Sequence, residues 1–189
     1  LGVTWMGVVA MAFAHYREFY KCLWQAMEPV VMTQAFADAC QKLRFAAEKE
    51  AASLSPVAIC SKLTKLGYDD REIEEIKNCN EIFSSGNMPY VLMATLARLL
   101  LEGHSWDGKG SAQTHDAPSI TFKRPVLIEL HHADPTTAVL FADIRKTLGL
   151  PFVNTDYRAF ARWPSYFNPA WTDLRSVSYT HLTLPTKRI

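Results

Sequence analysis

The sequence contains an internal repeat, and this feature constrains the fold more than any other. Residues 1–24, LGVTWMGVVAMAFAHYREFYKCLW, align without a gap with residues 148–171, LGLPFVNTDYRAFARWPSYFNPAW. The identical pairs are Leu1/Leu148, Gly2/Gly149, Ala12/Ala159, Phe13/Phe160, Ala14/Ala161 and Trp24/Trp171. The pairs that are aromatic in both copies are Trp5/Phe152, Tyr16/Trp163, Phe19/Tyr166 and Tyr20/Phe167. An offset of 147 residues is too long for a solenoid period, so we expect two tandem copies of one helical unit.

The hydrophobic pattern between the two copies is helical. Apolar residues recur at helical spacing, for example Phe36, Cys40 and Leu43, with charged residues between them. Proline and glycine punctuate this pattern and predict the helix boundaries. We expect helices over 5–49 with a break near Glu28-Pro29, from Ser53 to Gly67, from Asp69 or Asp70 to a break at Gly86-Asn87, from Pro89 onward, and from Asp134-Pro135 onward. The fold class is therefore predicted as all-α, with only SITF (119–122) or VLIEL (126–130) as short strand candidates.

These patterns divide the chain into four segments. They are a first helical repeat over 1–103, a linker loop over 104–134, the start of a second helical repeat over 135–176, and a tail over 177–189. The chain begins without a methionine or a basic n-region, so we expect a truncated front end rather than a signal peptide. Residues 177–186 resemble one reading frame of a transposase sequencing-library adapter, and the alternative is a genuine β-like tail. A cleft between two similar halves would be a favoured place for a ligand.

Composition excludes several classes of partner. A net charge of +1 gives no electrostatic footprint for nucleic acid or an anionic membrane surface, and no apolar run reaches the roughly 18 residues of a membrane span. The four cysteines are widely spaced without a CxxC motif, which favours reduced core thiols of a cytoplasmic protein over disulfides or metal ligands. The adjacent His131 and His132 would point to opposite sides of an extended chain, and HExxH and phosphate-loop motifs are absent. We therefore expect no metal.

Asp156 is the candidate for chemistry. It stands in NTDYRAF at the start of a predicted helix, and the residue aligned with it in the first repeat is the apolar Val9. Capping of the helix by Asp156 is one interpretation, but Asn154 and Thr155 offer caps as well. A carboxylate among aromatic neighbours has its pKa raised by desolvation, which suits a general base. Both roles stay open on spacing alone.

Four motifs together carry a resemblance to a known family. They are VTW near the start, GYDDREIEEI at 67–76, FxxGNxxY at 83–90 and TDYxAxAxWPxY at 155–166. The chain resembles the group I 2-haloacid dehalogenases, which act on D or on both enantiomers, over nearly all of residues 1–176. The resemblance implies an all-α pseudo-dimer of two repeats within one chain. It also implies hydrolysis of small 2-haloalkanoic acids to 2-hydroxy acids without cofactor or metal.

The resemblance also implies roles for individual residues. Asp156 matches the catalytic aspartate that deprotonates a water aimed at the substrate Cα, and Asn87 matches the asparagine that helps to hold that water. Direct attack of this water inverts Cα. Positions lining the substrate and halide pocket are matched by Trp5, Val8, Thr155 and Tyr90. Val8 departs from the expected phenyl ring, and a core role for Tyr90 is the alternative.

The expected partners are a small halogenated carboxylic acid and water, with a homodimer of the full-length protein. Three other functions stay open: a differently specialised or non-catalytic helical relative that binds small carboxylates, an unrelated proton abstraction on a carboxylic acid, and a protein-interaction module. Aromatic stripes are usually core, so Trp24, Trp163 and Trp171 carry no predicted role.

Overall fold

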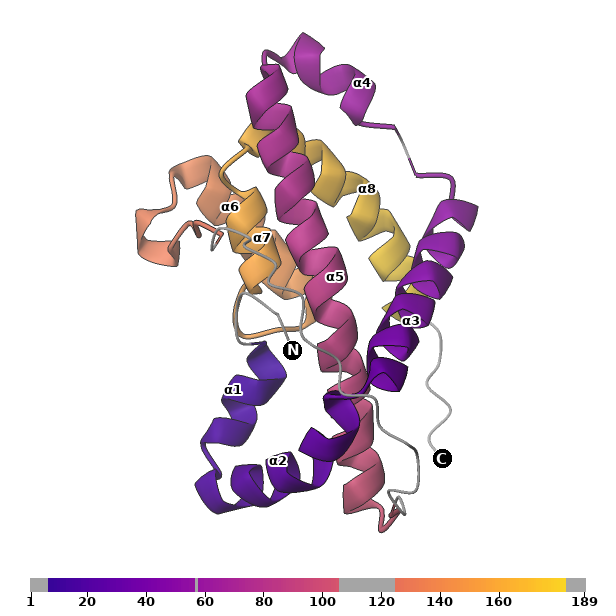
Figure 1. The fold of residues 1–189 in the computed structure, drawn as a ribbon. Coiled ribbons are helices and arrows are strands. Elements are labelled where there is room, and N and C mark those ends of the chain that lie inside the picture. Colours follow the sequence, from indigo (N-terminus) through magenta and orange to yellow (C-terminus); the bar gives the residue numbers. More distant parts are fainter. Residues whose placement is uncertain (1–6, 57, 106–124, 183–189) are drawn as a thin grey trace. The chain divides into compact units, whose positions relative to one another are not determined.

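The computed structural model describes residues 7–56, 58–105 and 125–182, and these form helices joined by turns and short loops (Figure 1). The α-helices are α1 (Val8–Ala14), α2 (Arg17–Val31), α3 (Gln34–Ser53), α4 (Cys60–Leu63), α5 (Asp70–Leu101), α6 (Pro135–Leu148), α7 (Thr155–Phe160) and α8 (Pro164–Leu182). Two 3₁₀ helices, η1 (Thr64–Leu66) and η2 (Leu130–His132), complete the described elements. The all-α prediction is confirmed: VLIEL is not a strand, and SITF lies outside the described residues.

The predicted break at Glu28-Pro29 is wrong. Helix α2 runs through Pro29 and ends at Val31, and the turn at Met32 and Thr33 separates it from α3. Proline near the end of a helix costs only one backbone hydrogen bond, whereas Thr33 actively starts the next helix. Its Oγ1 accepts from the N–H of Phe36 at 3.2 Å and donates to the carbonyl of Val30 at 2.7 Å. A second break, between α1 and α2, was not predicted.

The helix predicted from Ser53 begins later. Ser53 is the last residue of α3, where its hydroxyl donates to the carbonyl of Glu50 at 2.6 Å, and α4 starts only at Cys60. The predicted end is confirmed, because Gly67 closes η1 with φ of 96°, a left-handed conformation that glycine adopts without strain. Asp69 then caps α5 as expected, since its Oδ1 accepts from the N–H of Glu72 at 2.8 Å.

Helix α5 is continuous, so the break predicted at Gly86-Asn87 and the new start at Pro89 are wrong (Figure 1). The reason lies in the periodicity of the helix. The residues at alternating spacings of three and four are Ile76, Cys79, Phe83, Gly86, Tyr90, Met93 and Ala97, and all are buried except the half-buried Tyr90. This stripe passes through Gly86, and Pro89 lies beside it. Packing along such a stripe outweighs the local cost of one glycine and one proline.

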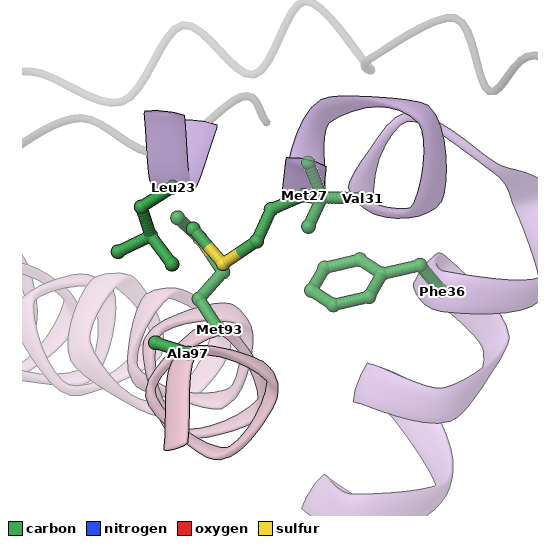
Figure 2. Close-up of a cluster of buried hydrophobic side chains, with 6 residues drawn as sticks. All are labelled: Leu23, Met27, Val31, Phe36, Met93 and Ala97. Carbon is green, nitrogen blue, oxygen red and sulfur yellow. The ribbon is translucent and has the colours of Figure 1, made fainter. Parts of the chain in front are cut away.

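The chain forms two compact units, and the first comprises residues 1–54 and 81–124. Its core gathers side chains from α2, α3 and α5, and Figure 2 shows them converging. The buried members are Leu23, Met27, Val31, Phe36, Met93 and Ala97. Arg44 of α3 also makes a two-pronged ion pair with Glu81 of α5, with N–O distances of 2.6 and 2.7 Å. These contacts fix the C-terminal part of α5 against α2 and α3.

The second unit comprises residues 55–80 and 125–189. Its core is formed by α6, the turn before α7, and α8, with Phe141, Ile144, Val153, Ala161, Phe167 and Trp171 buried. Asp134 is the N-cap of α6, as predicted, and its Oδ1 accepts from the N–H groups of Thr136 and Thr137. The indole of Trp171 donates to Asp143 of α6 at 2.8 Å, which ties α8 to α6.

Local structure repeats at the same 147-residue offset as the sequence. Helices α1 and α7 begin at residues 8 and 155, and α2 and α8 begin at residues 17 and 164. The edge-on ring pair Phe13–Phe19, with centroids 5.6 Å apart, recurs as Phe160–Tyr166 at 5.9 Å. The pair Phe13–Tyr20 recurs as Phe160–Phe167. These parallels favour the predicted tandem repeat.

Three further predictions from the sequence can be compared with the structure. Helix α8 continues to Leu182, although residues 177–182 show no helical period in the sequence. All four cysteines are free, but only Cys79 is buried and Cys40 half-buried, whereas Cys22 and Cys60 are exposed, so the core assignment is wrong for these two. None of the helices that the structure describes has both the length and the apolar character needed to cross a bilayer.

Candidate functional site

The head of α7 places Asp156 in the first turn of a short helix. The helix spans Thr155–Phe160, and Asn154 is its N-cap residue by backbone conformation. Asp156 is therefore the second helical residue and not the cap. Its carboxylate accepts hydrogen bonds from its own N–H and from that of Tyr157. Negative charge in the first helical turn is favoured by the helix dipole, so this local geometry tolerates an ionised Asp156.

The surroundings of Asp156 act in the opposite direction. The residue is half-buried, and desolvation raises the pKa of its carboxyl group above the usual value, partly offset by the two backbone hydrogen bonds. Burial, together with the Asp156 charge, raises the pKa of Tyr157 to about 12. The buried Cys79 also has its pKa raised to about 11, by burial first and by Asp156 as well. The expectation of a raised pKa for Asp156 is thus confirmed.

Asn154 is a functional candidate that the sequence did not single out. Its amide oxygen is buried and has no hydrogen-bond partner in the described part of the chain. The sequence suggested Asn154 as a helix cap, but its side chain makes no capping bond. A buried acceptor without a partner is costly, and it stands two residues before Asp156. It could accept a hydrogen bond from a bound water or substrate, and the sequence offered no signal for this.

The predicted residues of the first unit lie on α5 and α1. Asn87 is exposed on α5, and Tyr90 is three residues further on the same face of that helix. The Tyr90 ring packs against Gly7, where an added Cβ would lie 2.9 Å from ring carbons. Burial raises the pKa of the Tyr90 hydroxyl, although a hydrogen bond from the Gly7 backbone lowers it. Tyr90 therefore has a packing role, whatever else it does.

Two predicted positions are described only in part or not at all. Val8 is the first residue of α1, and nothing is described of its side chain. Trp5 lies outside the described residues. In the second unit, Thr155 is half-buried and occupies the first position of α7, directly before Asp156. The structure thus brings Thr155 and Asp156 together in one helical turn, and Asn87 and Tyr90 together on one face of α5.

This arrangement suits proton abstraction by a carboxylate. An ionised Asp156 with a raised pKa is a stronger base than an exposed aspartate. No group of three His, Cys, Asp or Glu side chains comes together as a possible metal site within the described ranges. The head of α7 offers one half-buried carboxylate, Asp156, as a base.

Comparison with known proteins gives a consistent set of relatives. No family model matches the chain. The chain is 48% identical over 182 residues to an (R)-2-haloacid dehalogenase of Rhizobium sp. (strain NHG3), covering 94% of this chain and 70% of that protein. It is 25% identical over 199 residues to a configuration-inverting 2-haloacid dehalogenase of Pseudomonas sp. (strain 113), covering all of this chain and 64% of that protein.

A solved structure shows the same fold. The D-2-haloacid dehalogenase mutant in complex with D-2-CPA superposes with a TM-score of 0.84 at 35% sequence identity. The match covers 93% of this chain and 62% of that chain. The present sequence thus spans between about three fifths and seven tenths of the length of these three proteins.

Proposed function

Because the chain belongs to the 2-haloacid dehalogenase family, whose members are hydrolases that act on carbon–halide bonds, we propose that the full-length protein converts small 2-haloalkanoic acids into 2-hydroxy acids. Water attacks Cα directly, and Asp156 is the general base. The observation that carries this proposal is the half-buried carboxylate of Asp156, whose pKa is raised by desolvation at the head of α7. A helix cap would need no such environment.

The proposed step balances without any cofactor. As the water oxygen forms a bond to Cα, the bond from Cα to the halogen breaks, and halide leaves with the bonding electron pair. One proton of the water passes to Asp156. In-line attack from the side opposite the halogen inverts the configuration at Cα. A positioned general base typically contributes about 10²- to 10⁴-fold to such a step.

The other predicted residues have supporting roles in this proposal. Asn87 is a second hydrogen-bond partner for the water, supported by its exposed amide on α5. Trp5, Val8, Thr155 and Tyr90 line the sites of halide and substrate. The leaving halide is large and weakly hydrated, so indole and backbone N–H donors suit its growing negative charge.

The relatives' names supply the expected enantiomer. The Rhizobium protein is named for the (R) enantiomer and the solved structure for the D enantiomer, whereas the name of the Pseudomonas protein states inversion. We therefore infer that (R)-2-chloropropionate is a substrate and that the product is (S)-lactate.

Chloride release tests the proposal directly. The protein at the full length of its relatives is incubated with (R)- or (S)-2-chloropropionate, and chloride and lactate configuration are measured. We expect chloride with the (R) substrate and (S)-lactate in equal amount. Saturable binding of 2-chloropropionate without chloride release would instead support a carboxylate-binding relative that lacks catalysis.

A further inference from the structure

Helix α7, which carries Asp156, is too short to hold its own geometry. It has six residues, and isolated helices below about 12 residues are marginal in water. The last four carbonyl groups of any helix also lack partners within that helix. The direction in which Asp156 points therefore depends on contacts that α7 makes with other parts of the second unit.

Arg158 supplies these contacts through both its backbone and its side chain. The N–H of Ile128 donates to the carbonyl of Arg158 at 3.0 Å, and Nε of Arg158 donates to the carbonyl of Ile128 at 3.2 Å. The guanidinium also forms an ion pair with Glu129. Two hydrogen bonds in opposite directions between the same two residues fix their separation and their relative orientation.

The same residue is bonded to the N-cap of the helix. The N–H of Arg158 donates to the carbonyl of Asn154 at 3.1 Å, which closes the turn that contains Asp156. Arg158 thus joins this turn to the segment 125–130, so a displacement of Arg158 would displace Asp156 as well.

The partner segment is itself anchored in the core of the unit. Ile128 packs against the buried cluster that contains Phe141 and Val153. The Arg158 side chain is only 21% exposed, against 50% for Glu129, so the guanidinium fork is largely shielded from solvent. A planar fork held by two acceptors defines one geometry more closely than a flexible ammonium group does.

Arg158 does not share the face of Asp156. Residues two apart on an α-helix project about 200° from each other, so the two side chains point to nearly opposite sides of α7. The shift in the Asp156 pKa has its causes in burial and in the backbone of residues 156 and 157. Arg158 therefore acts through the helix and not on the reacting atoms.

We propose that Arg158 is a positioning residue, which sets the direction of the Asp156 carboxylate by locking α7 to the segment 125–130. This inference rests on the proposed role of Asp156 as base. A misplacement of about 1 Å in a catalytic group can cost on the order of 10²-fold in rate. Loss of the Arg158 contacts should therefore lower kcat. Substrate binding and the pH at which kcat/KM falls on the acidic side should stay nearly unchanged.

The test compares two arginines of the same unit. Arg158→Met removes the fork and keeps an apolar stem, whereas Arg175→Met removes an arginine that pairs with Asp143 at 3.3 Å without contact to α7 in that pair. In the full-length protein we expect Arg158→Met to lose roughly 10- to 100-fold in kcat, with KM within about twofold of the parent. Arg158→Lys should recover part of the loss, and Arg175→Met should keep kcat within about twofold. Hydrogen exchange of the peptide over 155–160 should accelerate in the Arg158 variants and stay unchanged in Arg175→Met.

Several results would overturn this assignment. The assignment is overturned if Arg158→Met keeps the kcat of the parent. It is also overturned if the activity lost in this variant is no larger than the fraction of protein that is unfolded. If Arg158→Met does not fold, the milder Glu129→Gln decides, since an unchanged kcat and unchanged exchange in this variant reject the lock. A parent that releases no halide overturns the proposed function and this inference together, whereas an active parent with an equally active Arg158→Met overturns the inference alone.

Discussion

Replacing Asp156 by asparagine should separate its catalytic role from its structural role. Asparagine has nearly the same shape but cannot accept the proton of water. If Asp156 were only a helix cap, asparagine would replace it well, because the two cap about equally. In the structure Asp156 is not the cap, and desolvation raises its pKa. We therefore expect that Asp156→Asn loses activity and gains stability.

The sign and size of both effects follow from the raised pKa. Below the unfolded-state pKa the carboxyl is neutral in both states, so it costs nothing. As pH rises through the raised folded-state pKa of Asp156, ionisation becomes less favourable in the folded than in the unfolded state, and stability is lost. Asparagine avoids this loss, so the variant should be more stable than the parent at pH 7.5, and this gain should vanish near pH 3, where the carboxyl is neutral in both states. The loss in kcat should be about 10²- to 10⁴-fold.

The assay combines urea unfolding at pH 3 and pH 7.5 with chloride release from 2-chloropropionate. In the parent, kcat/KM should fall as pH is lowered through the raised pKa of Asp156, because the base must be ionised. Near-normal turnover in Asp156→Asn would return the residue to a structural role. The difference in unfolding free energy between Asp156→Asn and the parent is compared at the two pH values. If the variant gains less stability over the parent at pH 7.5 than at pH 3, the argument from desolvation is refuted.

Two further predictions concern the first unit. Gly7→Ala should cost about 1–3 kcal/mol in unfolding free energy, because its Cβ would lie 2.9 Å from the Tyr90 ring. In a double-mutant cycle with Tyr90→Leu, measured by urea unfolding, most of this cost should disappear. A cost of the same size in the Tyr90→Leu background would contradict the clash. Arg44→Met should cost about 1 kcal/mol, because it breaks the two-pronged pair with Glu81. Arg98→Met, which breaks an exposed pair with Glu102 at the C-terminal end of α5, should stay within about 0.5 kcal/mol. Equal costs for the two arginines would show that the pair between α3 and α5 has no special weight.

The sequence predicted the helical class and the capped boundaries well, since these depend on local chemistry. Asp134, Gly67 and Asp69 act where their side chains or backbone conformations indicated. The helix start predicted at Ser53 is wrong, and the break between α1 and α2 was missed. Two other failures come from treating Pro29 and Gly86 as obligatory breaks. Pro29 lies near the C-terminal end of α2, where a proline costs little. Gly86 lies in the buried stripe from Ile76 to Ala97, which decides the course of α5 over local propensity. That spacing was visible in the sequence and could have been counted through the supposed break.

The candidate site was predictable only where a single residue carried the signal. The contrast between Val9 and Asp156 in the repeat drew attention to one carboxylate, whose pKa is raised by desolvation on burial. The contact of Arg158 with Ile128 could not be predicted, because it joins residues 30 positions apart, and the segment that contains Ile128 forms no regular helix or strand. The orphaned oxygen of Asn154 likewise depends on tertiary burial, which no local pattern reports.

The central claim is that Asp156 activates water and does not attack Cα itself. Either route can release halide from the same carboxylate. A single turnover with enzyme in excess, run in water enriched with oxygen-18, separates them. Direct attack places the heavy oxygen on the hydroxyl of the first product, which we predict to be inverted at Cα, with no label in the peptide that contains Asp156. An unlabelled first product with oxygen-18 left on Asp156 would contradict the account, even if the enzyme releases halide.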